Sequence, residues 1–374
     1  MEKALRFVLL MGIVSLLGDT TYEGARSVMG AYLATFGISA LLLGFVVGIG
    51  EFLSYGFRIF SGYLADKSQR YWAFTFVGYA LIFSIPLIAF TNSIAIILLL
   101  IILERLGKAL RSPARDTLIS FATAKIGRGT GFGIHEALDQ IGAVLGPMIF
   151  FIVLYMGYGY KDGFLILFVP TFLLILTLLS AKKSYVGEEV RKENEDSLSK
   201  AFWLYILFTI FAVAGLVNFQ LLAYHFKLKS IFSDELIPIL YALAMGIDAI
   251  SAILVGKAYD KLGLRCLLLV PVLTPISVAL SLGANPILGL ILFGAIIGMQ
   301  ESIMRAGVAE MTGVGKRATA YGILNTGFGL GFFIGSFLMG ALYEISLDYL
   351  ILFSLGIEIV AFWILMLIIR EIKD

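Results

Sequence analysis

The chain contains little charge and few of the residues that carry covalent chemistry. Charged residues make up 14% of its 374 residues, and there are only two histidines and one cysteine. Cys266 therefore cannot form an internal disulfide, and it has no second thiol with which to hold a metal ion. The formal net charge is only +2, which gives no support to nucleic-acid binding.

Motifs of common enzymes are also missing from the sequence. Neither the H-E-x-x-H pattern of metalloproteases nor the G-x-S-x-G pattern of hydrolases occurs. A glycine series at 327–335 lies in an apolar stretch with no preceding strand, so it does not predict a phosphate-binding loop. We therefore expect a protein that is not an enzyme and that has no cofactor. Two other classes of protein remain as alternatives, a membrane-embedded hydrolase and a receptor.

Apolar residues dominate what is present, at 60% of the chain. They form twelve long runs separated by short polar breaks, and a membrane-spanning helix needs about 20 such residues. The first run has no small-residue cleavage site, so we expect an uncleaved first helix. The predicted spans are residues 4–36, 38–66, 71–90, 94–124, 127–156, 162–182, 200–229, 233–260, 265–282, 285–312, 315–344 and 347–370.

The distribution of lysine and arginine predicts the orientation of the chain. If the amino terminus is cytoplasmic, the outer loops contain only Lys161, Lys227 and Lys229, and the other loop cations lie inside. Cytoplasmic loops retain positive charge during insertion. We therefore expect both termini to be cytoplasmic, in the cell's cytoplasmic membrane.

Two short motifs occur twice at one offset. Gly62–Lys67 and Gly256–Lys261 share the pattern G-x-x-x-D-K, and 256 − 62 = 194. Arg111–Asp116 returns as Arg305–Glu310 at the same offset. The repeat predicts two related halves, residues 1–182 and 200–374, joined by the polar linker 183–199.

Together these features resemble the major facilitator superfamily. The family signature G-x-L-A-D-R-x-G-R-K is matched from Gly62 to Tyr71, with departures at Lys67, Gln69 and Tyr71 itself. The family's helix 4 arginine corresponds to Arg105. The resemblance implies an all-α membrane protein of twelve transmembrane helices, in two pseudo-symmetric six-helix bundles that alternate access to one central site.

A third signature, associated with proton-driven exporters of the family, lies in the fifth span. Gly133, Gly142, Gly146 and Pro147 fit it, whereas phenylalanines at 150 and 151 replace its last glycines. This partial match favours export.

The repeated motifs also suggest a cytoplasmic gate. The resemblance implies that Asp66 meets helix 11 and that Asp260 meets helix 5, where a carboxylate can accept hydrogen bonds from a helix amino terminus. It also implies the ion pairs Arg70–Asp116 and Arg265–Glu310. The alternative is that these charges only set topology. The expected gate residues are Gly62, Asp66, Arg70, Asp116, Asp260, Arg265 and Glu310.

Charged residues in the first and fourth spans recur at helical spacing. Their spacings of three and four place them on one face of each helix, and charges at membrane depth should face a cavity or an opposite charge. In the family, helices 1, 4, 7 and 10 line the cavity. The alternative is that acids and bases neutralise one another between helices. The candidate cavity residues are Asp19, Tyr22, Glu23, Arg26, Glu51, Arg58, Glu104, Arg105, Lys108, Arg111, Arg115, His135, Glu136, Asp139, Glu301 and Arg305.

These residues predict proton-coupled export of a small molecule by a monomer, with Asp19, Glu23, Glu136 and Asp139 as candidate proton carriers. The coupling ion is a proton or another ion. The alternative is uptake or exchange of an organic anion, bound by the cations of the fourth span. Metal-ion export is less favoured, because those cations would repel a metal ion and because the two histidines fall in opposite halves.

Overall fold

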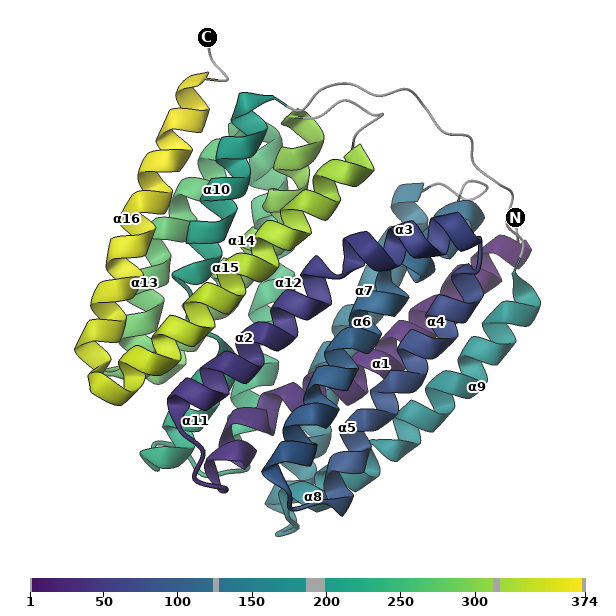
Figure 1. The fold of residues 1–374 in the computed structure, drawn as a ribbon, viewed down its shortest axis with the longest axis horizontal. Helices are drawn as coiled ribbons and strands as arrows, with labels where there is room; N and C mark the ends of the chain where they lie inside the picture. Colours follow the sequence, from purple (N-terminus) through teal and green to yellow (C-terminus); the bar gives the residue numbers. More distant parts are fainter. Residues whose placement is uncertain (1, 124–127, 186–198, 312–316, 372–374) are drawn as a thin grey trace. The chain divides into compact units, whose positions relative to one another are not determined.

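The computed structural model describes residues 2–123, 128–185, 199–311 and 317–371, and within these ranges the chain forms helices and no strands. Twelve long helical segments follow one another along the chain (Figure 1). In the first half they are α1 (Glu2–Ala34), α2 (Ala40–Gly56) with α3 (Arg58–Ser68), α4 (Tyr71–Ala80) continued by η1 (Leu81–Phe83), α5 (Ser84–Leu87) and η2 (Ile88–Phe90), α6 (Ile94–Thr123), α7 (Arg128–Tyr155), and α8 (Tyr160–Ile166) with α9 (Phe168–Ser184). In the second half they are α10 (Lys200–Ala214) with α11 (Phe219–Leu228), α12 (Leu236–Leu262), η3 (Gly263–Leu268) with α13 (Leu269–Leu282), α14 (Pro286–Met311), α15 (Arg317–Ile345) and α16 (Leu347–Glu371).

Eleven of these segments are long and apolar enough to cross a membrane. The twelfth, α6, has 30 residues and is long enough, but charged side chains interrupt its apolar run from Glu104 onwards. The prediction of an all-α, twelve-helix membrane protein is confirmed.

Three spans are interrupted in ways that the apolar pattern did not predict. Phe57 separates α2 from α3, and Leu167 separates α8 from α9. Residues 215–218 separate α10 from α11, where the Asn218 side chain accepts a hydrogen bond from the backbone N–H of Leu221 at 2.8 Å. That cap satisfies a donor at the start of α11 and stabilises the break.

The chain packs into two compact units. Unit 1 comprises Met1–Tyr32, Phe57–Arg191 and Phe232–Ala242, so it contains most of α1, α3 to α9 and the start of α12. A buried cluster around Phe7, Tyr79 and Leu174 joins α1, α4 and α9. Helices α1 and α7 approach closely at Gly146, where an added Cβ would meet the backbone of Thr20 and Gly24. The absence of a side chain at Gly146 permits this approach.

Unit 2 comprises Leu33–Gly56, Lys192–Ile231 and Leu243–Asp374. Its core includes Phe202, Phe208 and Leu365, from α10 and α16. Helix α2 packs along α15, although the two are far apart in the sequence. A Cβ at Gly44 would meet the carbonyl group of Ser336, so the absence of a side chain permits this approach.

Candidate functional site

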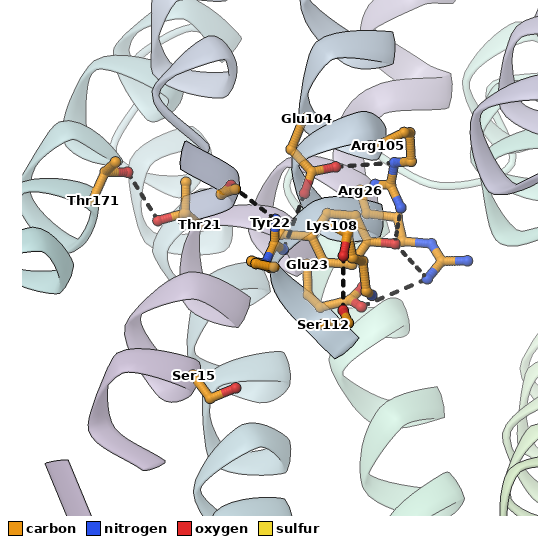
Figure 2. A network of polar contacts seen from close by, with 12 residues as sticks. Ser15, Thr21, Tyr22, Glu23, Arg26, Glu104, Arg105, Lys108, Ser112 and Thr171 are labelled. Atoms are coloured by element: carbon orange, nitrogen blue, oxygen red, sulfur yellow. Dashed lines mark hydrogen bonds and ion pairs between the residues drawn. The ribbon is translucent and has the colours of Figure 1, made fainter. Parts of the chain in front are cut away.

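The Tyr22 side chain on α1 lies at the centre of a group of cations in unit 1. The guanidinium carbon of Arg105 is 3.9 Å from the centre of the Tyr22 ring, and the Lys108 ammonium is 4.2 Å from it (Figure 2). The Tyr22 hydroxyl accepts hydrogen bonds from Arg105 and, at 3.0 Å, from Arg26. The ring therefore holds three positive side chains, two on α6 and one on α1, by its electron-rich face and its oxygen.

Glu104 on α6 is fully buried and neutralises two arginines. Its carboxylate lies 3.0 Å from Arg105 Nε and 3.3 Å from Arg111 Nη2. Arg105 and Arg111 are themselves only 7% and 3% exposed. Because a buried charge is costly without a partner, Glu104 makes this concentration of arginines possible.

A second polar group joins α1, α6 and α7. Ser15 donates a hydrogen bond to the Asp139 carboxylate and accepts one from Arg115 Nη1 at 3.1 Å. Arg115 also lies 2.9 Å from the carboxylate of Asp116. Asp19 is within electrostatic range of Asp139, Lys108 and Arg111, so it connects this group to the cations around Tyr22.

Glu23 faces the start of α12. Its carboxylate accepts a hydrogen bond from the Tyr241 hydroxyl at 2.6 Å and lies 3.6 Å from Arg26 Nη1. Both Glu23 and Tyr241 belong to unit 1, and both are buried. Glu23 therefore links Arg26 of α1 to a residue of the second half of the sequence.

The structure thus brings together eight of the sixteen candidate cavity residues around Tyr22 and Glu104, and Arg115 and Asp139 lie in the adjoining Ser15 group. The eight are Asp19, Tyr22, Glu23, Arg26, Glu104, Arg105, Lys108 and Arg111.

The remaining candidates lie elsewhere or outside this network. His135 on α7 is buried and lies within electrostatic range of Arg115 and Asp139, whereas Glu136 is exposed. Glu51 is buried in unit 2, and Arg58 begins α3 in unit 1. Glu301 is half-buried on α14. The side chain of Arg305 lies outside the described part of the structure.

The expected Arg70–Asp116 ion pair is replaced by another, whereas the expected contact of Asp66 with helix 11 stays a prediction. Asp66 is exposed and accepts a hydrogen bond from the Tyr71 hydroxyl at 2.9 Å. Asp116 pairs with Arg115, its neighbour on α6, and not with Arg70. Arg115 Nε and Nη2 both lie 2.9 Å from Asp116 Oδ1, whereas Arg70 is exposed at the start of α4.

The other four expected gate residues are Gly62, Asp260, Arg265 and Glu310. A Cβ at Gly62 would lie 3.4 Å from Pro113, so this glycine marks where α3 packs on α6. Arg265 is exposed in η3. The side chains of Asp260 and Glu310 lie outside the described residues, so the Arg265–Glu310 pair stays a prediction.

Two residues of this network were not predicted from the sequence. Ser15 lies four residues before Asp19 and so occupies the same face of α1, a signal that helical spacing alone could have supplied. Tyr241 lies 218 residues from Glu23, and no sequence pattern joins the two. Within the described ranges, no group of three or more His, Cys, Asp or Glu side chains is arranged to hold a metal ion.

Comparison with known proteins identifies the family. The family model for the Major Facilitator Superfamily matches residues 8–306. An uncharacterized protein of Mycobacterium tuberculosis is 37% identical, over 96% of this chain and 91% of that protein. An uncharacterized MFS-type transporter of Methanocaldococcus jannaschii is 29% identical, over 96% of this chain and 94% of that protein.

Solved structures share the fold. The nucleoside transporter NupG superposes with a TM-score of 0.74 at 16% identity, over 97% of this chain and 99% of that one. The peptide transporter POT in complex with sulfate gives a TM-score of 0.78 at 15% identity, over 98% and 94% of the two chains. The resemblance found in the sequence is confirmed, as is the expectation that the protein is not an enzyme. The chain belongs to the major facilitator superfamily of membrane transporters.

Proposed function

We propose that this transporter exports a small molecule in exchange for protons, by alternating access, and that the side chains around Tyr22 and Asp139 form its substrate and proton site. The observation that carries the proposal is the chain of hydrogen bonds from Arg115 through Ser15 to the Asp139 carboxylate, which joins α1, α6 and α7 within electrostatic range of Asp19. When Asp19 or Asp139 binds a proton, the local charge changes by one unit. The electrostatic attraction between these carboxylates and Lys108 and Arg111 then becomes weaker. Release of the proton then alters how the same cations hold a substrate.

The direction of transport is supported by two further observations. The exporter-like glycines Gly142 and Gly146 of α7 lie against the backbone of α1, next to the segment that contains Asp19 and Tyr22. In addition, a segment that covers 32% of this chain is similar to the multidrug resistance protein MdtH of Photorhabdus laumondii, with 31% sequence identity. Both favour export over uptake.

The proposed mechanism also includes a membrane orientation, two functional halves and a cytoplasmic gate. We place both termini in the cytoplasm, because positive charge is scarce in the loops assigned to the outside. The repeat offset supports two functional halves, residues 1–182 and 200–374, and a gate formed by the repeated motifs that contain Asp66 and Asp260. Rocking of such halves about a fixed site is a general transport mechanism. The monomer is the proposed functional form.

Everted membrane vesicles that express the protein test the proposal. Their exposed face is cytoplasmic, and respiration acidifies their interior, so a proton-coupled exporter loads substrate inward as protons leave. Cationic dyes and organic anions are added one at a time, and the internal pH is followed with a ΔpH-sensitive dye. We expect a transported compound to raise the internal pH. Asp139→Asn should abolish this pH response but preserve substrate counterflow, whereas Asp348→Asn, at an exposed site on α16, should change neither. A pH response that Asp139→Asn leaves intact would contradict the assigned proton site.

A second candidate is exchange of organic anions, which the three cations around Tyr22 favour. Arginine and lysine side chains fixed by an aromatic ring are suited to carboxylate or phosphate groups. Counterflow stimulated by anions, unchanged by the imposed pH gradient, would support this candidate over proton-coupled export.

A further inference from the structure

A buried carboxyl group in unit 2, that of Glu358, lies on a helix that does not contribute to the Tyr22 network. Glu358 is in the middle of α16 and is only 1% exposed. By normal hydrogen-bond geometry, neither of its carboxyl oxygens has a partner among the described residues. The polar side chain beside it is Thr274 on α13, whose hydroxyl donates to the carbonyl of Val270 at 2.8 Å.

The other wall of this site is the break between α10 and α11. A Cβ at Gly215 would lie 2.7 Å from the carboxyl carbon of Glu358, so the carboxyl occupies the space that a side chain at position 215 would need. Ser354, one turn before Glu358, donates a hydrogen bond to the Gly215 carbonyl at 2.7 Å. Helix α16 therefore both holds the break and points an acid at it.

No charged side chain of the described residues compensates this acid. The helices packed on α16 are α10, α13, α15 and the short η3. Lys200 of α10 pairs with Glu371 at 3.5 Å, Arg265 of η3 is exposed, and α13 contains no charged residue. On α15, Glu344 is exposed and accepts a hydrogen bond from the backbone of Leu41.

The tyrosines of these helices do not neutralise it either. Tyr205 of α10 has its hydroxyl 3.2 Å from the Met304 carbonyl, and Tyr343 of α15 lies 2.8 Å from His225 Nδ1. Tyr321 is near the start of α15, far along the helix from Tyr343. An ionised carboxylate in these surroundings would carry an uncompensated charge, which is costly at membrane depth.

We propose that Glu358 is a reversible proton-binding site, opened and closed by the α10–α11 break. Broken helices in transporters provide free backbone groups and points of bending at membrane depth. With the break packed as described, the carboxyl is dry and holds its proton. When residues 215–218 shift and water reaches the carboxyl, the proton leaves. The site does not depend on the proposed export activity, because proton binding is measurable without any substrate.

Infrared difference spectroscopy of the purified full-length protein in liposomes tests the site. In the wild type, a step from about pH 5 to about pH 9 should remove a carbonyl-stretch band of a buried carboxylic acid. That band should be lost in Glu358→Gln and retained in Asp348→Asn, an exposed carboxylate on the same helix. Identical difference spectra for the wild type and Glu358→Gln, or a Glu358 band that persists unchanged over this pH range, would overturn the proposal.

Two further measurements keep the result decisive. Thr274→Val, which keeps the shape but removes the hydroxyl, should shift the band, and this variant serves if Glu358→Gln does not fold. Replacing choline by Na⁺ at constant pH and ionic strength should leave the band unchanged, and loss of the band on Na⁺ addition would identify a metal-ion site in place of a proton site. If the Glu358 band fails to titrate while Asp139→Asn still abolishes the vesicle response, this site falls and the proposed function stands.

Discussion

The Lys108 ammonium lies over the ring of Tyr22, 4.2 Å from its centre, and the Arg105 guanidinium lies 3.9 Å from the same ring. One aromatic side chain on α1 therefore fixes two cations of α6. Glu104 pairs with Arg105 and also with Arg111, so one acid is shared by two arginines beside the Tyr22 ring.

Removal of the Tyr22 hydroxyl should weaken substrate binding. Tyr22→Phe loses the oxygen that accepts hydrogen bonds from Arg26 and Arg105, and hydrogen bonds to charged groups contribute about 1.5 to 3 kcal/mol. We expect the apparent KM to rise about tenfold, a change of about 1.4 kcal/mol, with a larger rise for Tyr22→Leu, which also loses the ring. Substrate concentration series in vesicles measure both, with Tyr349→Phe as an exposed control. Equal values for Tyr22→Phe and Tyr22→Leu would exclude a contribution of the ring.

Loss of the Glu104 charge should destabilise unit 1. Glu104→Gln leaves Arg105 and Arg111 buried without their shared counter-ion, and removal of one partner of a buried ion pair costs about 3 to 5 kcal/mol. Thermal unfolding in detergent should show a Tm several degrees below the wild type. Asp348→Asn, at an exposed site, should unfold like the wild type. The double variant Glu104→Gln/Arg111→Gln should recover part of the loss, and no recovery would show that the arginine charge is not the cause.

A methyl group between α2 and α15 should be poorly tolerated. In Gly44→Ala the new carbon meets the backbone of Ser336, and overpacking of this kind costs about 1 to 3 kcal/mol. We expect a lower Tm and slower transport. Gly356→Ala is the matched control, because a Cβ there has no neighbour within 4 Å and alanine favours a helix. If both variants unfold at the same temperature, the α2–α15 contact is not as tight as described.

Neutralisation of Asp66 tests the gate independently of stability. Asp66 is exposed, so Asp66→Asn should leave the Tm near the wild-type value but lower the transport rate and shift the balance between inward- and outward-open forms. That balance can be measured with labelled cysteines introduced into a Cys266→Ser background, since Cys266 is the only native cysteine. Tyr71→Phe separates the gate from the local hydrogen bond at 2.9 Å. Unchanged rate and balance in Asp66→Asn would leave topology as the only role of this charge.

The fold could be predicted from the sequence because apolar run length determines membrane helices almost alone. Most predicted spans end within about three residues of the observed helices, and α6 was recognised as a span despite its charges. The interruptions were missed, since hydropathy does not register a break such as residues 215–218 when apolar residues continue through it.

The candidate site was predictable in part, for a related reason. Helical spacing places Asp19, Glu23 and Arg26 on one face of α1, and likewise the charges of α6, without knowledge of the fold. Contacts between distant segments, such as Glu23 with Tyr241, depend on packing that no local pattern encodes. The Arg115–Asp116 pair was missed because adjacent helical residues do not normally face each other, so a more distant partner was expected for Asp116.

The assignment of Leu33–Gly56 to unit 2 and of Phe232–Ala242 to unit 1 has a consequence for any attempt to divide the protein. A cut between residues 183 and 199 yields two fragments, each of which keeps a segment that packs in the other fragment's unit. Fragment 1–182 would carry α2 without α15, and fragment 200–374 would carry Tyr241 without Glu23. Co-expressed halves should therefore assemble by reciprocal exchange of these segments, and neither half alone can complete its packing.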